Sequence, residues 1–458
     1  MSVPAPAAPP DEPSVAALIA ARPHLAMHAS DGLVLEDVPL NAIADAIGTP
    51  AWVYGAGTMR QRLRALQAAL EGTGAHVHYA VKANDHLAVL AIFGAGGAGA
   101  DVVSGGELAR ARRAGIPPGR IVFSGVGKTR AELEFAVAQK IMQINVESDA
   151  ELAMLDAVGR AAGHAMPISL RVNPDIDANT HHKITTGKSE NKFGVDWTRA
   201  EEVLKRAQTM RGIEIAGLAV HIGSQLMELE PFEAAFARLR DLVVQLRAAG
   251  IPIRRLDLGG GLGVPYVADA NDTPPSPDAY GAVVRRTLGD LDCAFVFEPG
   301  RLLVANAGLL VARVILIKQG AMRTFIVCDA AMNDLVRPAM YDAHHDILPV
   351  IEPAAGAALA PADVVGPVCE SGDTFARQRP LPPLAAGDLI AFATAGAYGA
   401  AMSSMYNARL LVPEVLVKGD RFAVVRARPT YDEMLALERL PDWQQPAHGP
   451  AAVVPAET

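Results

Sequence analysis

Short β-prone runs alternate with longer amphipathic segments through the middle of the chain. Runs of this length, separated by helical segments, are typical of the strands of a buried parallel sheet. They predict eight strands, at residues 76–83, 100–104, 121–124, 143–146, 168–172, 217–222, 256–258 and 295–298. The segments between them predict helices, for example at residues 106–114, 130–139, 149–162, 198–210 and 231–249. This alternation favours a parallel (β/α)8 barrel, with an open doubly wound sheet as the alternative.

After Arg301 this rhythm changes. Apolar runs at residues 308–318, 324–328, 389–394 and 414–417 are separated by Gly and Pro and not by long helices. Such a pattern predicts a mainly β second domain.

The expected organisation of the chain follows from these patterns. The Pro/Ala-rich ends have a composition that favours disorder. We expect a disordered tail at 1–23, a segment packing with the β domain at 24–51, the barrel at 52–301, the β domain at 302–440 and a second disordered tail at 441–458.

Composition narrows the class of protein. The chain has 458 residues, half of them hydrophobic, which is enough for two to three domains and a large core. A net charge of -9 without a basic stripe argues against a nucleic-acid partner. Cys293, Cys328 and Cys369 have no CxxC spacing, which fits a reducing compartment. Without a membrane-length apolar run or a signal-like start, we expect a cytoplasmic enzyme with no membrane partner.

Lys82 ends the first predicted strand, in the sequence Tyr-Ala-Val-Lys-Ala-Asn of residues 79–84. A lysine at this place in a barrel can form a Schiff base with an aldehyde cofactor, provided that burial lowers the pKa of its amine. A lone lysine after a strand is more commonly a solvated surface charge. The functional interpretation therefore depends on what stands at the other strand ends.

Two further clusters follow the sixth and seventh predicted strands. His221 could stack its imidazole on a flat aromatic cofactor while Ser224 reaches a phosphate. The run Gly259, Gly260 and Gly261 lets the backbone approach a ligand, and its N–H groups can cradle phosphate oxygens. The structural alternatives are a strand-end turn with a hydrogen-bonded histidine and a flexible glycine turn.

The eighth predicted strand ends in Glu298, Pro299, Gly300 and Arg301. Loops after strands seven and eight are the usual phosphate site of such barrels. Glu298 beside a pyridine nitrogen would keep that nitrogen protonated and make the ring an electron sink. An ordinary Glu–Arg surface pair is the alternative. Taken with Lys82, these strand ends predict a site for pyridoxal 5'-phosphate.

With these motifs the chain resembles the fold-type III decarboxylases of basic amino acids over about residues 30 to 430. The segments 337–341, 369–373 and 397–399 are most similar to the branch that acts on meso-2,6-diaminopimelate. The resemblance implies a pyridoxal-phosphate barrel followed by a β domain like that of alanine racemase. It also implies a homodimer with shared active sites. The implied reaction yields L-lysine and CO2, as the last step of lysine biosynthesis.

The resemblance also implies roles for single residues. Cys369 would be the proton donor and Glu370 would contact the far ammonium group, both contributed by the partner subunit. Arg301, Arg337 and Tyr341 would hold the far carboxylate of the substrate. Tyr398 would touch both the substrate and the cofactor. The complete set of candidate cofactor-binding residues is Lys82, His221, Ser224, Gly259, Gly260, Gly261, Glu298, Pro299, Gly300, Arg301 and Tyr398.

Charge favours the same substrate. Ornithine, lysine and arginine carry a cationic tail, which Arg301 and Arg337 would repel, whereas the arginine fork binds a carboxylate in two charge-assisted hydrogen bonds. Decarboxylases of carboxynorspermidine, ornithine or arginine remain alternatives. So do an alanine-racemase-like enzyme and a non-enzymatic cofactor-carrying homologue.

A polar loop that contains His181 and His182 follows the fifth predicted strand and resembles the mobile active-site loop of the family. The paired histidines lack a third ligand at a sensible spacing, so no metal site is expected.

Overall fold

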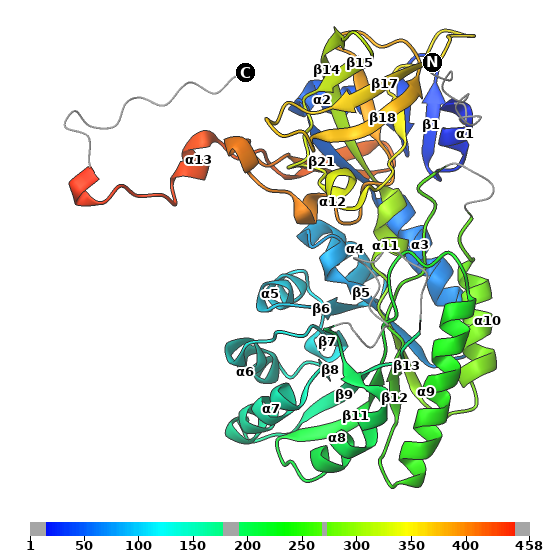
Figure 1. Cartoon of the computed structure of the whole chain (residues 1–458), viewed down its shortest axis with the longest axis vertical. Helices are drawn as coiled ribbons and strands as arrows, with labels where there is room; N and C mark the ends of the chain where they lie inside the picture. Colours follow the sequence, from blue (N-terminus) through cyan, green and yellow to red (C-terminus); the bar gives the residue numbers. More distant parts are fainter. Residues whose placement is uncertain (1–14, 177–191, 268–272, 445–458) are drawn as a thin grey trace, which may run out of the picture.

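The computed structural model describes residues 15–176, 192–267 and 273–444. Eight parallel strands close into a barrel, because the last of them, β13, pairs back onto the first, β5 (Figure 1). The closed ring confirms the predicted (β/α)8 barrel and excludes the open sheet. In order around the barrel the strands are β5 (Ala75–Ala80), β6 (Gly99–Val102), β7 (Ile121–Phe123), β8 (Gln143–Val146), β9 (Met166–Asn173), β11 (Ile213–Ala219), β12 (Arg255–Asp257) and β13 (Ala294–Phe297).

Helices surround the barrel on its outside (Figure 1). Helix α6 begins with a capping box between Thr129 and Glu132, and α7 ends at Gly163, whose φ of 74° suits the left-handed conformation. The helix predicted over 198–210 is shorter than expected, with its regular part confined to α8. Within the described ranges, no helix is long and apolar enough to cross a membrane. The helices are α3 (Ala56–Ala69), α4 (Leu87–Ala95), α5 (Gly105–Arg113), α6 (Arg130–Gln139), α7 (Asp149–Ala162), α8 (Ala200–Ala207), α9 (Glu230–Ala248) and α10 (Pro277–Leu288).

A mixed sheet forms the second unit and confirms the predicted mainly β domain. Its strand order is β18-β17-β15-β14-β4-β20-β21, and β19 joins β14 and β16 beside it. Strand β4 lies in the middle of this sheet although it precedes the barrel in the chain. The bounds are β4 (Ala51–Gly55), β14 (Gly308–Gln319), β15 (Thr324–Cys328), β16 (Ile347–Pro349), β17 (Ala360–Val365), β18 (Thr374–Leu381), β19 (Leu389–Phe392), β20 (Glu414–Lys418) and β21 (Arg421–Arg426).

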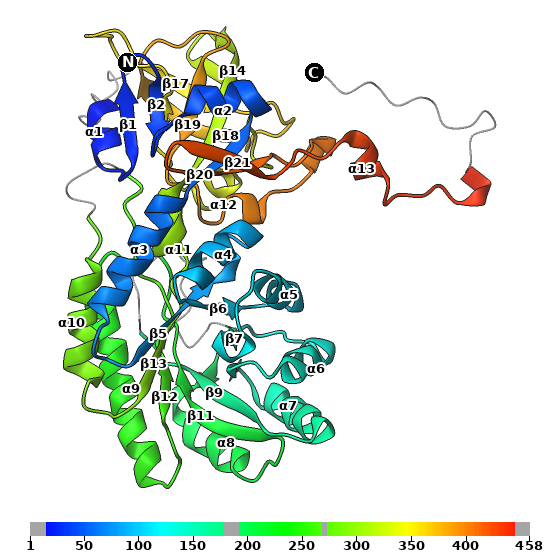
Figure 2. The ribbon, with the colours of Figure 1, turned by 180° about the vertical axis from the view of Figure 1, so that it is seen from behind.

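The N-terminal segment packs on this sheet (Figure 2). Leu33 and Ile43 share a hydrophobic core with Val311 of β14. One expectation is corrected here, since residues 15–20 of the predicted disordered tail form a helix, and its Leu18 and Ile19 are buried in the same core. Burial of this apolar pair outweighs the Pro/Ala-rich composition around it. The segment contains α1 (Val15–Ala20), β1 (Leu25–His28), β2 (Gly32–Leu35), β3 (Val38–Pro39) and α2 (Leu40–Ile47).

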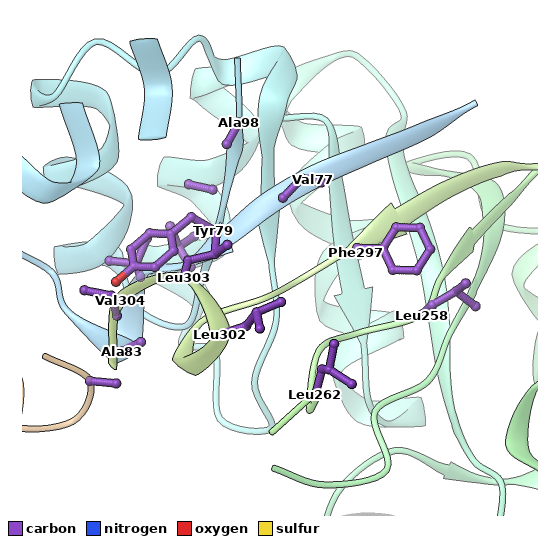
Figure 3. Close-up of a cluster of buried hydrophobic side chains, with 14 of the residues drawn as sticks. Val77, Tyr79, Ala83, Ala98, Leu258, Leu262, Phe297, Leu302, Leu303 and Val304 are labelled. Atoms are coloured by element: carbon purple, nitrogen blue, oxygen red, sulfur yellow. The ribbon is translucent and has the colours of Figure 1, made fainter. Parts of the chain in front are cut away.

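The main hydrophobic core fixes the strand ends that carry the candidate site. Figure 3 shows Tyr79 of β5 beside the short helix α11 (Arg301–Val304), with Phe297 of β13 in the same cluster. The Tyr79 ring also packs 4.2 Å from that of Phe93, and its hydroxyl donates to the carbonyl of Asn84 at 3.1 Å. This packing holds the carboxyl ends of β5 and β13 next to each other.

Candidate active site

A cavity of about 450 Å³ lies between the carboxyl ends of the barrel strands and the β domain. This is the position at which (β/α)8 barrels carry their active sites. All but two of the predicted site residues line it. They are Lys82, His221, Ser224, Gly259, Gly260, Gly261, Glu298, Pro299, Gly300, Arg301, Arg337, Tyr341 and Tyr398.

Lys82 stands in a short 3-10 turn after β5, and its Nζ lies 3.3 Å from Oδ2 of Asp101 on the neighbouring strand β6. Burial disfavours the charged amine, but the surrounding negative charge, chiefly that of Asp101, outweighs it and raises the pKa of Lys82. Burial lowers this pKa as expected, but its effect does not decide the net shift, so the condition of a lowered pKa is not met. The carboxylate on the next strand decides the sign of the shift.

Glu298 belongs to a buried polar network inside the barrel. Its Oε1 accepts hydrogen bonds from Ser124 Oγ and Asn145 Nδ2, both at 3.3 Å. The same Asn145 amide donates to Asp257 Oδ2 at 2.8 Å. Burial, together with the charges of Asp101 and Asp257, raises the pKa of Glu298 well above its ordinary value. These surroundings therefore favour the neutral form of the Glu298 carboxyl.

The glycine run packs closely against its neighbours. A Cβ on Gly260 would lie 2.3 Å from the carbonyl oxygen of Glu298, so this position needs glycine. The N–H of Gly260 donates to His221 Nδ1 at 3.2 Å, and that of Gly259 donates to Asp257 Oδ1 at 3.1 Å. These two N–H groups thus bind the protein itself, which corrects the expectation that they face a phosphate. Burial lowers the pKa of His221 well below its usual value, so the ring is neutral.

Two arginines face the cavity from different units. Arg301 donates to Ser224 Oγ from Nε at 3.3 Å and from Nη2 at 3.1 Å, and its guanidinium lies 4.8 Å from the centre of the Tyr398 ring. Arg337 comes from helix α12 (Arg337–Tyr341) of the β domain and contacts His345 Nε2 at 2.9 Å. In the described part of the chain, neither forms an ion pair with a carboxylate. The cavity therefore offers two positive charges to an anionic ligand.

Cys369 and Glu370 do not line this cavity, and both side chains are exposed. The backbone N–H of Cys369 donates to Asn407 Oδ1 at 3.2 Å, which places the segment on the surface of the β domain. The polar loop with His181 and His182 lies outside the described residues.

Sequence reasoning missed Asp101, Tyr266 and His345, which contact Lys82 or the two arginines. Asp101 had a signal, because it is a charged residue within a short buried strand. Tyr266 and His345 stand outside the strands and helices, where no periodic pattern predicts the direction of a side chain.

These groups fit pyridoxal 5'-phosphate. The Lys82 amine suits its aldehyde, and the buried Glu298 carboxyl suits its ring nitrogen. Ser224 supplies a hydroxyl for its phosphate.

Comparison with known proteins agrees with pyridoxal 5'-phosphate as the cofactor. Residues 56–305 match the family model of the pyridoxal-binding domain of pyridoxal-dependent decarboxylases. The diaminopimelate decarboxylase of Zymomonas mobilis is 47% identical over 414 residues, which cover 90% of this chain and 97% of the relative. The diaminopimelate decarboxylase of Pseudomonas aeruginosa is 47% identical over 408 residues, which cover 89% of this chain and 97% of the relative.

Solved structures give the same result. The crystal structure of diaminopimelate decarboxylase from Helicobacter pylori complexed with L-lysine has a TM-score of 0.83 at 38% identity, covering 87% of this chain and 98% of that one. The crystal structure of diaminopimelate decarboxylase from M. jannaschi has a TM-score of 0.87 at 33% identity, and the match covers 93% of this chain and 99% of that one. Because these matches span most of the chain and nearly all of each relative, the chain belongs to the diaminopimelate decarboxylases, a family of pyridoxal-phosphate enzymes.

Proposed function

We propose that this protein decarboxylates meso-2,6-diaminopimelate to L-lysine and CO2 with pyridoxal 5'-phosphate as its cofactor. The observation that carries the proposal is the pair of buried arginines, Arg301 and Arg337, in the same cavity as Lys82. A substrate with a purely cationic tail would be repelled by both. Diaminopimelate ends in a second amino-acid head, whose carboxylate suits the arginine fork.

In the proposed reaction, each residue of the site would have its own role. When bound, the cofactor supplies an aldehyde for the amine and a cationic ring that takes up the electrons of the broken bond. Lys82 stands 3.3 Å from Asp101, so the ammonium proton has a carboxylate to receive it when the amine reacts. The buried Glu298 carboxyl would share a proton with the ring nitrogen, since burial and the charges of Asp101 and Asp257 raise its pKa. The neutral His221 presents its ring to the cavity.

The far end of the substrate would lie at the β domain. Arg337 and Tyr341 both line the cavity from α12, where they can bind the second carboxylate. Tyr398 also lines the cavity and packs on Arg301. Fixing the far end in this way orients the carboxylate that leaves.

A homodimer is part of the proposal. Cys369 and Glu370, the expected proton donor and ammonium ligand, are exposed and lie outside the cavity of their own chain. A second copy that places these two side chains over the cavity would complete the site. The C-terminal segment around α13 (Tyr431–Leu435) extends from the body of the molecule and exposes Leu437 and Trp443, which supports self-association (Figures 1 and 2).

Mixing two inactive variants tests the shared site. Lys82→Ala and Cys369→Ala dimers, dissociated together and reassociated, should regain about a quarter of wild-type activity, because random pairing in a two-fold dimer restores one intact site in each mixed dimer. Each variant mixed with itself is the control. No recovery in mixtures that have demonstrably exchanged subunits would contradict the shared site.

A substrate panel tests the reaction. The protein should release CO2 and L-lysine from meso-diaminopimelate, and should do so far faster than it acts on ornithine, arginine, carboxynorspermidine or alanine. Lys82→Ala should abolish turnover, and Arg337→Ala should raise the KM for diaminopimelate. Arg286→Ala, on the barrel surface, is the matched control. Faster turnover of any other substrate would refute the assignment.

We also place the enzyme in the cytoplasm. Cys293, Cys328 and Cys369 are all free thiols, which suits a reducing compartment. Cell fractionation tests this location.

A further inference from the structure

The arginine pair poses a physical problem. Arg301 and Arg337 are each only 7% exposed, and both face one cavity. Two buried like charges repel each other and lose hydration. Across residues 15–176, 192–267 and 273–444, no carboxylate lies within ion-pair distance of either guanidinium. Neutral groups must therefore hold the pair in place.

Tyr266 contacts both arginines with different parts of one side chain. Its hydroxyl oxygen accepts a hydrogen bond from Arg301 Nη1 at 2.5 Å. The Arg337 guanidinium lies 4.6 Å from the centre of its ring, within the range of a cation–π contact. The residue itself is 7% exposed and lines the cavity. A single phenol thus joins a barrel arginine to an arginine of the β domain.

Tyr266 and Arg337 are in turn fixed by His345. The His345 ring meets the Tyr266 ring edge-on, at 5.5 Å between centres and an interplanar angle of 89°. His345 Nδ1 faces the carbonyl oxygen of Ala393 at 2.9 Å, so its Nε2 is left to accept from Arg337 Nη1 at 2.9 Å. The arginines are therefore positioned by a phenol and a neutral imidazole, and both positive charges remain available to a ligand.

We propose that Tyr266 is a positioning residue that sets the preference for a ligand with a carboxylate at its far end. It does so by keeping Arg301 and Arg337 in one fixed arrangement. Because this role presupposes the proposed function, the test must separate the two. Tyr266 does not take part in bond making or breaking.

Two substitutions of Tyr266 remove different sets of its contacts. Tyr266→Phe removes the hydroxyl bonded to Arg301 and keeps the ring beneath Arg337, whereas Tyr266→Leu removes both. The probes are L-2-aminopimelate, which carries a far carboxylate, and L-norleucine, which has the same amino-acid head and ends in a methyl group. Their dissociation constants are measured on the holoenzyme from the change in cofactor absorbance.

The expected result is selective. Tyr266→Phe should raise the dissociation constant of aminopimelate about ten-fold, as expected for a lost hydrogen bond to a charged group. Tyr266→Leu should raise this dissociation constant by a further factor of about two to thirty, because the cation–π contact is also lost. L-Norleucine affinity should change less than about two-fold in either variant, because norleucine makes no far-carboxylate contact. With meso-diaminopimelate, KM should rise and kcat should stay close to wild type.

Tyr54→Phe is the matched control. Tyr54 is also buried, and its hydroxyl bonds Glu414 at 2.6 Å in the β domain, but it does not line the cavity. This variant should lose thermal stability without changing the preference between the two probes. Equal weakening of aminopimelate and norleucine binding by Tyr266→Leu, or no weakening of either, would overturn the inference. The wild type could fail to decarboxylate diaminopimelate while the Tyr266 variants still lose aminopimelate binding selectively. That result would refute the proposed function and support the inference about Tyr266.

Discussion

Replacing Asp101 with asparagine should lower the pKa of the Lys82 amine. Asp101 Oδ2 lies 3.3 Å from Lys82 Nζ, and the Asp101 side chain is fully buried. Asparagine has nearly the same shape, so the substitution removes a charge and little packing. The amine then loses the interaction that outweighs its own burial.

Coulomb's law sets the magnitude. At 3.3 Å two unit charges attract by about 5 kcal/mol at an effective dielectric constant of 20, and by about 1.3 kcal/mol in bulk water. The Lys82 side chain is 38% exposed, so solvent screens part of this attraction. A value of about 1.5 to 3 kcal/mol corresponds to about one to two pKa units. The fraction of neutral amine at a given pH should rise about ten-fold to one hundred-fold.

Competitive acetylation of the cofactor-free protein measures this pKa directly. The rate at which Lys82 reacts is followed against pH by mass spectrometry of its peptide, for wild type and Asp101→Asn. Asp290→Asn is the control, because Asp290 pairs with Arg240 on the surface. An Asp101→Asn curve that overlays the wild type, or shifts to higher pH, would refute the electrostatic reasoning.

Three further outcomes are expected. Gly260→Ala should abolish cofactor binding in equilibrium dialysis, since its Cβ would lie 2.3 Å from a backbone oxygen, at a cost of about 1–3 kcal/mol or more. Lys128→Met should destabilise the fold by about 3–5 kcal/mol in urea, because it leaves Glu151, 2.7 Å away, as a buried unpaired acid. Burial lowers the pKa of His78 to about 3. Below pH 6.5 the unfolded chain therefore binds more protons than the folded protein, and the free energy of unfolding decreases as the pH is lowered. His78→Leu should remove about 2 kcal/mol of the loss between pH 7 and pH 5.

The sequence by itself determined the elements of the fold and most of the site. The eight barrel strands were predictable because short β-prone runs recur between helical segments, although 217–222 was placed too late by several residues. Lys82, Glu298 and the glycine run were predictable because strand ends of a barrel converge on one face.

Only the tertiary structure decided which groups touch. The charge on Lys82 is set by Asp101, 19 residues further along the chain, and the arginine pair is held by Tyr266, which no local pattern singled out. Strand β4 precedes the barrel yet pairs with β14 and β20 of the other sheet. Hydrophobic periodicity is a property of neighbouring residues, so sequence reveals it. Coulomb attraction, cation–π contact and strand pairing act through space, so they appear only once the chain is folded.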